Sequence, residues 1–594
     1  MSERMDILRV FLDLMWFFRN HQRRYLSGII FLIVVSLLGL VPPVIVGRAI
    51  NRMQHQTLTA PVLEEYLAII LVTALSSYGL RYLWRVQLFG GSILLATVLR
   101  DRLYEHFTRL SPEFYQSHRI GDLMAHATND VQAIQETAGD GVMMMVDSVV
   151  SGLAVVITMA VVINWKLTLI SLLPLPLMAV VITHYGRILH ERFTLAQAAF
   201  SDINDRVQEY ISGIRVVRAF GQEAFERQSF VELSRDVVEK NVAVAKIDSL
   251  FDPTISVIVG FSYFLALAVG SLYVVHGTMN IGNLTTFTLY LGQLIWPMMA
   301  FGFLFNVVER GSASYDRVQQ LLEIDPQVVD AKDALESVPS GSILFDIPSF
   351  RYPHTGITVL QSIHLSLAKG TTLGIVGRTG AGKTTLLRLL LREFDLQEGD
   401  ITIGGTSIYA YQLQALRQAV AYAPQDDFLF SMSIRENIAF QSPDASLYEI
   451  QEKARMAGIH DDILDFPLGY DTIVGERGVT LSGGQKQRIS IARALLAEAE
   501  ILILDDTLSA VDARTESAIL NALKRNRHGR TTLIATHRLS AVEHADQIIV
   551  LEHGRIVEQG THTDLLQQRG RYFDMYQRQQ LENLVQQGGV AHES

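Results

Sequence analysis

Long apolar stretches with almost no charged residues fill the first half of this 594-residue chain. A bilayer core is crossed by about 20 mostly apolar residues in a helix. One such stretch can be a buried helix of a soluble protein, but a series of them predicts a membrane domain with six spans. We expect the Pro42-Pro43 pair to kink the first span. The predicted spans are residues 25–47, 62–86, 141–163, 167–187, 250–275 and 284–308.

Basic residues are distributed unevenly among the connections of these spans. The N-terminal segment and the long connections, 87–140 and 188–249, are rich in arginine, whereas the short connections hold few basic residues. Because basic connections stay on the cytoplasmic side, both long connections are predicted to be cytoplasmic. An even number of spans then returns the chain to the cytoplasm. The sequence therefore predicts a multi-pass protein of the cell (cytoplasmic) membrane with cytoplasmic N- and C-termini.

The long connections are charged but keep a helical periodicity, which predicts cytoplasmic hairpins that continue the membrane helices. Residues 117–121 and 212–220 are candidates for the hairpin tips, and ordinary solvated loops are the alternative. A tip that contacts a cytoplasmic domain would transmit motion to the membrane.

Composition changes after the last span. Asp, Pro, Ser and Gly become frequent, as expected for a linker, and an alternation of apolar and charged residues typical of a soluble α/β domain follows. The predicted parts are an amphipathic cytoplasmic segment (1–24), a six-helix transmembrane domain with long hairpins (25–310), a linker (311–340), an α/β nucleotide-binding domain (341–580) and a C-terminal tail (581–594).

Charge and cysteine content exclude several kinds of function. The formal net charge is −11 and no basic stripe stands out, so nucleic acid is not an expected partner. The chain has no cysteine, which excludes disulfides, thiolate metal sites and cysteine nucleophiles.

The nucleotide-binding assignment begins with a glycine-rich segment. Residues 377–385 read Gly-Arg-Thr-Gly-Ala-Gly-Lys-Thr-Thr, between an apolar strand and an apolar helix. This context fits the phosphate-binding loop Gly-x-x-x-x-Gly-Lys-[Ser/Thr], in which backbone N–H groups and a helix N-terminus face phosphate oxygens. We expect Lys383 to contact the β- and γ-phosphates of ATP, and the Thr384 hydroxyl to bind Mg²⁺.

An apolar strand that ends in an acidic residue follows later in the chain. Residues 501–504 are Ile-Leu-Ile-Leu, and Asp505 comes next. In P-loop proteins the Asp at this position holds Mg²⁺. Any buried strand can end in Asp, but together with the loop at 377–385 it predicts a nucleotide site that takes ATP and Mg²⁺.

Further motifs give the chain a specific resemblance. Residues 481–485, Leu-Ser-Gly-Gly-Gln, resemble the signature motif of ABC ATPases, residues 509–512 resemble the D-loop, and His537 resembles the switch histidine. Residues 472–478, which include Gly-Glu-Arg-Gly at 475–478, resemble an exporter-specific loop that touches the membrane hairpins. In its whole layout the chain is similar to half-size multidrug-type ABC exporters, particularly subunits of bacterial heterodimeric pairs. The resemblance implies an α-helical transmembrane domain followed by an α/β P-loop NTPase domain.

The resemblance also implies roles for single residues. Tyr352 would stack on adenine, Gln425 would sense Mg²⁺ and the membrane domain, and Asp506, His537 and Gln425 would be catalytic. The signature motif would bind ATP that the opposite subunit holds. The implied metal residues are Thr384, Gln425 and Asp505, and the implied nucleotide-binding residues are Tyr352, Gly377, Arg378, Thr379, Gly380, Ala381, Gly382, Lys383, Thr384, Thr385, Ser482, Gly483, Gly484 and Gln485.

Asp506 departs from the family pattern. The family usually has Glu there, which polarises the attacking water. An Asp carboxylate lies one methylene, roughly 1.5 Å, further back, and a misplacement of about 1 Å can cost on the order of a hundredfold in rate. We therefore hypothesise slow ATP hydrolysis at the site built on this chain's own Walker motifs, which are the loop at 377–385 (Walker A) and the strand that ends in Asp505 (Walker B). We also hypothesise a heterodimer with a second half-transporter. A homodimer in which Asp506 reaches far enough is the alternative.

No readable motif encodes the transported molecule. Asp147 is alone in the third span and either recognises cationic drugs or is paired or hydrated near the cytoplasmic end. Soft and aromatic side chains in the spans suit amphipathic ligands, although helix packing and lipid contact account for most of them. These side chains are Met143, Met144, Met145, Phe261, Tyr263, Phe264, Tyr290, Trp296, Met298 and Met299.

These observations together predict a transport ATPase. The expected function is ATP-driven efflux of hydrophobic or amphipathic compounds, with a second half-transporter, the lipid bilayer and an amphipathic small molecule as partners. A lipid or glycolipid flippase is one alternative. An ATP-gated subunit that pumps nothing is another, because a slow site can gate without cycling.

Overall fold

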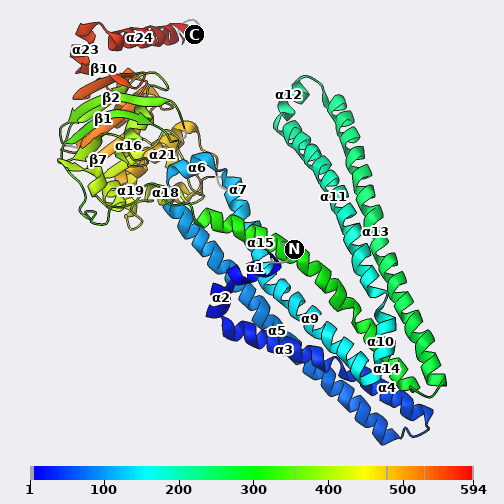
Figure 1. Ribbon diagram of the computed structural model, residues 1–594. Helices are drawn as coiled ribbons and strands as arrows, with labels where there is room; N and C mark the ends of the chain where they lie inside the picture. The colour runs from blue at the N-terminus through cyan, green and yellow to red at the C-terminus, as the bar shows by residue number, and fades with distance from the viewer. Residues whose placement is uncertain (1–5, 354, 476–478, 527–528, 591–594) are drawn as a thin grey trace. The chain divides into compact units, whose positions relative to one another are not determined.

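The chain forms two compact units (Figure 1). The first unit, Met1–Phe107 with Gly121–Ile324, is helical, and the second, Thr108–Ile120 with Asp325–Ser594, contains the β-sheets. The residues that the computed structural model describes are 6–353, 355–475, 479–526 and 529–590.

Long helices make up the first unit. By length and composition, five helical stretches among the described residues can cross a membrane, namely Gln22–Gln54, Ala60–Arg109, Ile120–Leu172, Glu223–Val275 and Ile281–Leu322. The helices are α1 (Asp6–Asp13), α2 (Met15–Asn20), α3 (Gln22–Leu38), α4 (Val41–Gln54), α5 (Ala60–Arg109), α7 (Ile120–Ala125), η1 (His126–Asp130), α8 (Val131–Glu136), η2 (Thr137–Gly141), α9 (Val142–Ile157), η3 (Thr158–Asn164), α10 (Trp165–Leu172), α11 (Leu175–Ser212), α12 (Ile214–Ala219), α13 (Glu223–Val275), α14 (Ile281–Gln293) and α15 (Ile295–Leu322).

The predicted fourth span, residues 167–187, is not one continuous helix. Asn164 leaves helical geometry, and its side chain accepts hydrogen bonds of 3.0 Å from the backbone N–H groups of Lys166 and Leu167. This N-cap separates α10 from the preceding helix in the predicted short connection. Pro174 then lies between α10 and α11, so the predicted span is divided between these two helices.

The first predicted span is divided at its proline pair. Gly39 and Leu40 separate α3 from α4, and Pro42 lies in the first turn of α4, where a missing N–H is tolerated. Two backbone carbonyls at this break accept hydrogen bonds from α14. The Tyr290 hydroxyl donates to the Leu40 carbonyl at 2.6 Å, and the Gln293 amide donates to the Gly39 carbonyl at 3.1 Å. The predicted kink is therefore a helix break that a neighbouring helix stabilises.

Glycines allow α4 and α14 to approach closely. A Cβ atom at Gly47 would lie 2.5 Å from the carbonyl oxygen of Gly282, and a Cβ atom at Gly282 would overlap the carbonyl oxygen of Gly47. At the same crossing the Gly282 N–H donates to the Asn51 side chain at 2.6 Å, and the Thr286 hydroxyl donates to the Pro43 carbonyl at 3.1 Å. Small residues with interhelical hydrogen bonds are typical of membrane helix interfaces.

The two hairpin tips differ in their packing. The first contains α6 (Pro112–Ser117), just before the predicted segment 117–121, and its residue Phe114 is buried. This tip clusters with the second unit, to which Thr108–Ile120 belongs. The second tip, α12, lies inside the predicted segment 212–220 between the long helices α11 and α13 (Figure 1) and has no buried residue.

Two boundaries differ from the sequence-based expectation. α15 continues to Leu322, so the helix extends beyond residue 310, and the first strand begins at Ile343. At the other end of the second unit, α24 continues into the predicted tail as far as Val590.

The second unit contains two sheets. The order is β2-β1-β4-β5 in the antiparallel sheet and β10-β9-β3-β8-β7-β6 in the larger one, where β3, β6, β7, β8 and β9 are parallel. The strands are β1 (Ile343–Arg351), β2 (Thr358–Leu367), β3 (Thr372–Val376), β4 (Asp400–Ile403), β5 (Thr406–Ser407), β6 (Val420–Ala423), β7 (Ile501–Asp505), β8 (Thr531–Thr536), β9 (Gln547–Glu552) and β10 (Arg555–Gly560). The main helices are α16 (Lys383–Leu390), α17 (Leu413–Gln418), α18 (Ile434–Ile438), α19 (Leu447–Met456), α20 (His460–Leu464), α21 (Gly483–Leu496), α22 (Ala513–Asn526), α23 (His562–Gln568) and α24 (Arg571–Val590).

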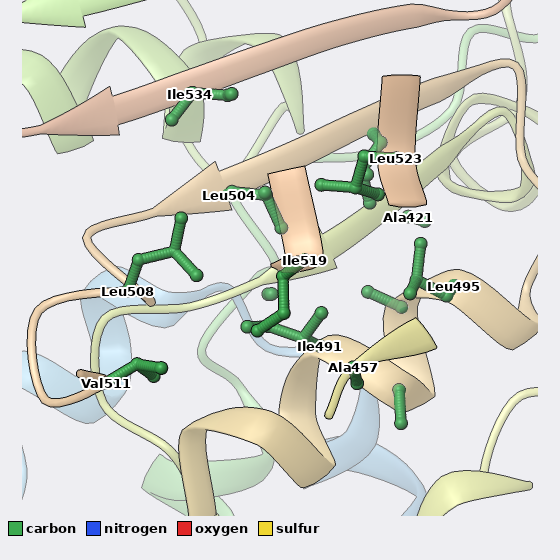
Figure 2. Packing of buried hydrophobic residues seen from close by; sticks show 14 of the residues in the cluster. Ala421, Ala457, Ile491, Leu495, Leu504, Leu508, Val511, Ile519, Leu523 and Ile534 are labelled. Atoms are coloured by element: carbon green, nitrogen blue, oxygen red, sulfur yellow. The ribbon is translucent and has the colours of Figure 1, made fainter. Parts of the chain in front are cut away.

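A dry core holds the parallel strands in place. Leu504 of β7 and Ile534 of β8 are register partners, and both are buried with Ile519 of α22 and Ile491 of α21 (Figure 2). Burying such side chains contributes roughly 1.5–3 kcal/mol each. The predicted fold class, a helical membrane unit followed by an α/β domain, is confirmed.

The glycine crossing of α4 and α14 yields a stability prediction. Replacing Gly47 by Val would push the helices apart and should cost on the order of 1–3 kcal/mol through overpacking. A lower thermal unfolding midpoint in detergent would show this. Gly79→Val is the matched control, because a Cβ atom there has no other atom within 4 Å. Equal midpoints for the two variants would contradict the assigned contact.

Candidate nucleotide-binding site

The site lies where three neighbouring parallel strands end. Val376 of β3 pairs with Thr536 of β8, and Asp505 of β7 pairs with Ala535 of β8. The strands therefore reach the same edge of the sheet at the same level. In open α/β sheets ligands bind at this carboxyl edge.

The glycine-rich loop leads from β3 into α16. Gly380 and Gly382 have φ values of +82° and +104°, a conformation that residues with a Cβ atom rarely adopt. A Cβ atom at Gly382 would also lie 2.7 Å from the Leu360 side chain. At position 382, both the positive φ and the close Leu360 side chain therefore favour glycine. Helix α16 begins directly after it, at Lys383.

Lys383 folds back over this loop. Its ammonium donates to the carbonyl oxygens of Gly377 at 2.8 Å and Arg378 at 3.3 Å. Burial lowers the pKa of Lys383, and the nearby carboxylates of Asp506 and Asp505 act against this by raising it. The loop therefore holds a positive charge at the N-terminus of α16, where anions are favoured.

Asp505 is the most deeply buried charged group of the site. It is 1 % exposed at the end of β7. The Thr384 hydroxyl donates to one carboxylate oxygen at 3.0 Å, and the Tyr422 hydroxyl donates to the other at 3.2 Å. Burial raises the pKa of Asp505, while the hydrogen bonds from Thr384 and Tyr422 lower it. The predicted partners Thr384 and Asp505 are thus brought together.

The oxygen donors at this position fit Mg²⁺. Hydroxyl and carboxylate oxygens are its preferred ligands, and it is usually held by one or two protein groups together with phosphates and waters. In the described part of the chain, no group of three or more His, Asp and Glu side chains is arranged to hold a metal ion.

Asp506 and His537 face each other across the ends of β7 and β8. Asp506 has a φ of +52°, and its N–H donates to the Ala535 carbonyl at 2.8 Å. The turn places its carboxylate oxygens 2.9 and 3.2 Å from Nδ1 of His537. Two of the three residues predicted to be catalytic, Asp506 and His537, are therefore hydrogen-bonded to each other beside Lys383.

The other two predicted residues lie at the margins. Gln425 follows β6, is exposed, and forms no hydrogen bond with another described residue. The Tyr352 hydroxyl lies 2.9 Å from the Thr385 hydroxyl, and its ring packs edge-on against Phe350 and Phe394. Tyr352 is thus beside the loop, and its stacking on adenine stays a prediction.

The signature segment is built into a different part of the unit. Ser482 caps α21 through a capping box with Gln485, whose amide also donates to Asp462 at 3.1 Å. Close to this start, a Cβ atom at Gly484 would lie 2.8 Å from the Ala510 carbonyl oxygen. Within the described residues, no hydrogen bond or ion pair joins Ser482–Gln485 to the loop at 377–385.

Three side chains that sequence reasoning missed connect these motifs. Tyr422 binds Asp505, and Gln487 joins the D-loop by donating to the Ser509 hydroxyl at 3.2 Å and accepting from the Ala510 N–H at 2.9 Å. Arg538 donates to the Val511 carbonyl at 2.9 Å and forms an ion pair with buried Glu516 at 3.1 Å. Only the neighbouring motif residues, such as His537 before Arg538, hint at these roles in sequence.

The exporter-specific loop is described only in part. Gly475 ends a segment in which the Val474 N–H donates to the Met432 carbonyl at 3.1 Å. Glu476, Arg477 and Gly478 of the predicted loop lie outside the described residues.

Comparison with known proteins covers both units. Residues 25–298 match the family model described as the ABC transporter transmembrane region, and residues 360–509 match that described as ABC transporter. The multidrug resistance-like ATP-binding protein MdlA of Escherichia coli K12 is 49% identical over 577 residues, which is 97% of each chain. An ATP-dependent lipid A-core flippase of Syntrophus aciditrophicus is 34% identical over 593 residues, covering 98% of this chain and 96% of the relative.

A solved structure has the same fold over nearly the whole chain. It is a bacterial Atm1-family ABC exporter with ATP bound, 27% identical, with a TM-score of 0.77 over 94% of this chain and 98% of that one. Since the membrane helices, the P-loop site and these similarities agree, the chain belongs to the ABC transporter family, as an exporter-type half-transporter with an ATPase domain coupled to transport.

Proposed function

We propose that the protein exports hydrophobic or amphipathic compounds of the multidrug type across the cytoplasmic membrane. The resemblance to MdlA supports this substrate class. The membrane helices support it too, since they carry exposed aromatic side chains such as Phe261, Phe264 and Trp296. Adaptable apolar surfaces of this kind suit ligands of varied shape.

In this proposal ATP occupies the carboxyl edge of β3, β7 and β8. Lys383 would exchange its contacts with the loop carbonyls for phosphate oxygens, and loop N–H groups would surround the phosphates. Thr384 and Asp505 would hold Mg²⁺, with Gln425 as a further ligand that approaches from its exposed position. When bound, Mg²⁺ would neutralise charge that develops on the phosphates.

The hydrogen bond between Asp506 and His537 is the observation that carries the proposal of a slow site. Both carboxylate oxygens of Asp506 lie within 3.2 Å of the His537 ring. The short side chain is therefore held by His537, the residue that follows β8. A Glu would extend one methylene further toward an attacking water, where position within about 1 Å matters strongly for rate.

The position of the signature segment supports a dimer. Helix α21 begins at Gly483 with its glycines and the Ser482 cap, a start suited to a phosphate of ATP. Its described contacts go to Asp462 and the D-loop, so the proposed phosphate belongs to nucleotide on a second polypeptide. We favour a heterodimer, because a partner with Glu after its Walker B Asp would give one fast site next to this slow one.

A lipid or glycolipid flippase is the second candidate. The 34% identical relative named a lipid A-core flippase favours it. Competition separates the two: a phospholipid that displaces drug transport in proportion to its concentration would favour the flippase.

Transport should depend on the P-loop lysine. In inverted membrane vesicles that contain the protein and its natural partner, we expect ATP-dependent uptake of a lipophilic dye, and none with a non-hydrolysable analogue. Lys383→Ala should reduce uptake and ATP affinity at least about tenfold, because a half-buried ammonium that would bind phosphate is lost. Lys369→Ala is the control, since Lys369 binds Ser340 and Glu500 at an exposed turn. Equal loss in both variants would contradict the assigned role.

Lengthening Asp506 should speed hydrolysis. Asp506→Glu is expected to raise the ATPase kcat of the purified complex by about tenfold to a hundredfold, because the carboxylate reaches the attacking water. Phosphate release at saturating ATP measures this. Asp506→Asn keeps the length but removes the charge and should not accelerate the reaction. Equal kcat values for wild type and Asp506→Glu would remove the slow-site proposal.

Purification from native membranes tests the heterodimer. A tagged chain should bring down a second half-transporter in equal amount, with Glu after its Walker B Asp and an altered signature motif. Mass spectrometry and the stoichiometry of the complex give the answer. A complex that contains only this polypeptide would establish the homodimer.

A further inference from the structure

Asp147 lies in α9 and is held by neutral groups, one from α9 itself and one from α15. The indole N–H of Trp296, in α15, donates to one carboxylate oxygen at 3.2 Å. The hydroxyl of Ser151 lies 2.7 Å from the other oxygen and 2.8 Å from the hydroxyl of Ser36 in α3. The carboxylate therefore sits where α3, α9 and α15 meet.

In the part of the chain that the structure describes, no Lys, Arg or His forms an ion pair with Asp147. A half-buried charge in a membrane helix is costly unless it is compensated. Two neutral donors leave acceptor sites of the carboxylate unused, since it can accept about four hydrogen bonds. Among the described residues of this chain, the carboxylate is thus bound by neutral donors and keeps acceptor sites for a cation.

The surroundings are soft and aromatic. Trp296 is 54 % exposed although its N–H is bound, so its ring is open to a ligand. Met143 and Met144 precede Asp147 by four and three residues and therefore share its face of α9. Phe303 follows Trp296 by seven residues on the corresponding face of α15 and is exposed. Such a surface binds bulky apolar groups without a fixed shape.

We propose that Asp147 and Trp296 form a recognition site for lipophilic organic cations. The carboxylate compensates the positive charge, the indole ring interacts with the cation through its face, and the methionines contact its apolar substituents. The inference names a substrate class and rests on the proposed export function for its role in the cell. The binding itself does not depend on hydrolysis.

Two ions of matched shape and opposite charge test the site. The protein is assembled with its natural partner in lipid nanodiscs without ATP. The binding of tetraphenylphosphonium and of tetraphenylborate to this complex is then measured. Asp147→Asn should weaken tetraphenylphosphonium binding at least about tenfold, because a charge interaction at low dielectric is lost. Tetraphenylborate binding should stay unchanged or become tighter. Trp296→Leu should weaken the cation more than Trp296→Phe, which keeps an aromatic face.

Controls keep the result interpretable. Glu309→Gln removes the same charge from an exposed position of α15 and should bind both ions like wild type. Asp147→Glu keeps the charge and should retain the preference for the cation. The site is rejected if Asp147→Asn binds tetraphenylphosphonium within twofold of wild type, or if it loses both ions equally. Vesicle export can fail while the complex still prefers tetraphenylphosphonium to tetraphenylborate. That result would reject the proposed export function and retain the proposed binding site.

Discussion

The parallel pairing of β3, β8 and β7 is the constraint on which the nucleotide site depends. It brings Lys383, Asp505 and His537 to one edge of the sheet, although the loop and the acidic strand are far apart in sequence. The buried aliphatic layer between this sheet and the helices α21 and α22 fixes the register. Asp506 is positioned by the same sheet, because its N–H donates to the Ala535 carbonyl. Its carboxylate then lies within hydrogen-bond distance of His537. The geometry for hydrolysis is thus a property of the sheet and not of one loop.

Much of this site could be predicted because short local sequence motifs contain the residues that form it. The Gly380 and Gly382 conformations, the start of α16 at Lys383 and the pairing of Thr384 with Asp505 follow from residue types at fixed spacing. The hydrogen bonds of Tyr422 and Gln487 could not be predicted in this way. They join strands and helices that are distant in sequence, and no local pattern states which side chain fills the space between two motifs.

In the membrane unit, hydropathy predicts where most spans lie, but it does not predict where helices are capped or broken. Apolar length located five helical stretches that can cross a bilayer. The fourth predicted span differs because its apolar residues are shared by α10 and the first turns of α11, with Pro174 between them, while α11 soon carries Arg187 and Glu191. Caps and breaks also need specific partners. The carbonyl of Leu40 accepts a hydrogen bond from Tyr290, which lies on a helix packed beside it.

Helix continuity is a physical route by which movement of a hairpin tip would reach a predicted membrane span. The tip helix α6 clusters with the nucleotide-binding residues, and it directly follows α5, a single helix of 50 residues that contains a predicted span. At about 1.5 Å per residue such a helix is roughly 75 Å long, so a small tilt at its tip becomes a large displacement at its far end. The second tip, α12, has no buried residue in its own chain, and the signature segment has no described bond to its own P-loop. Both are surfaces that one chain leaves unused. A second polypeptide that occupied both would tie ATP binding at one site to helices of the other chain, and a difference between Asp and Glu at the two sites would then set which site drives the cycle.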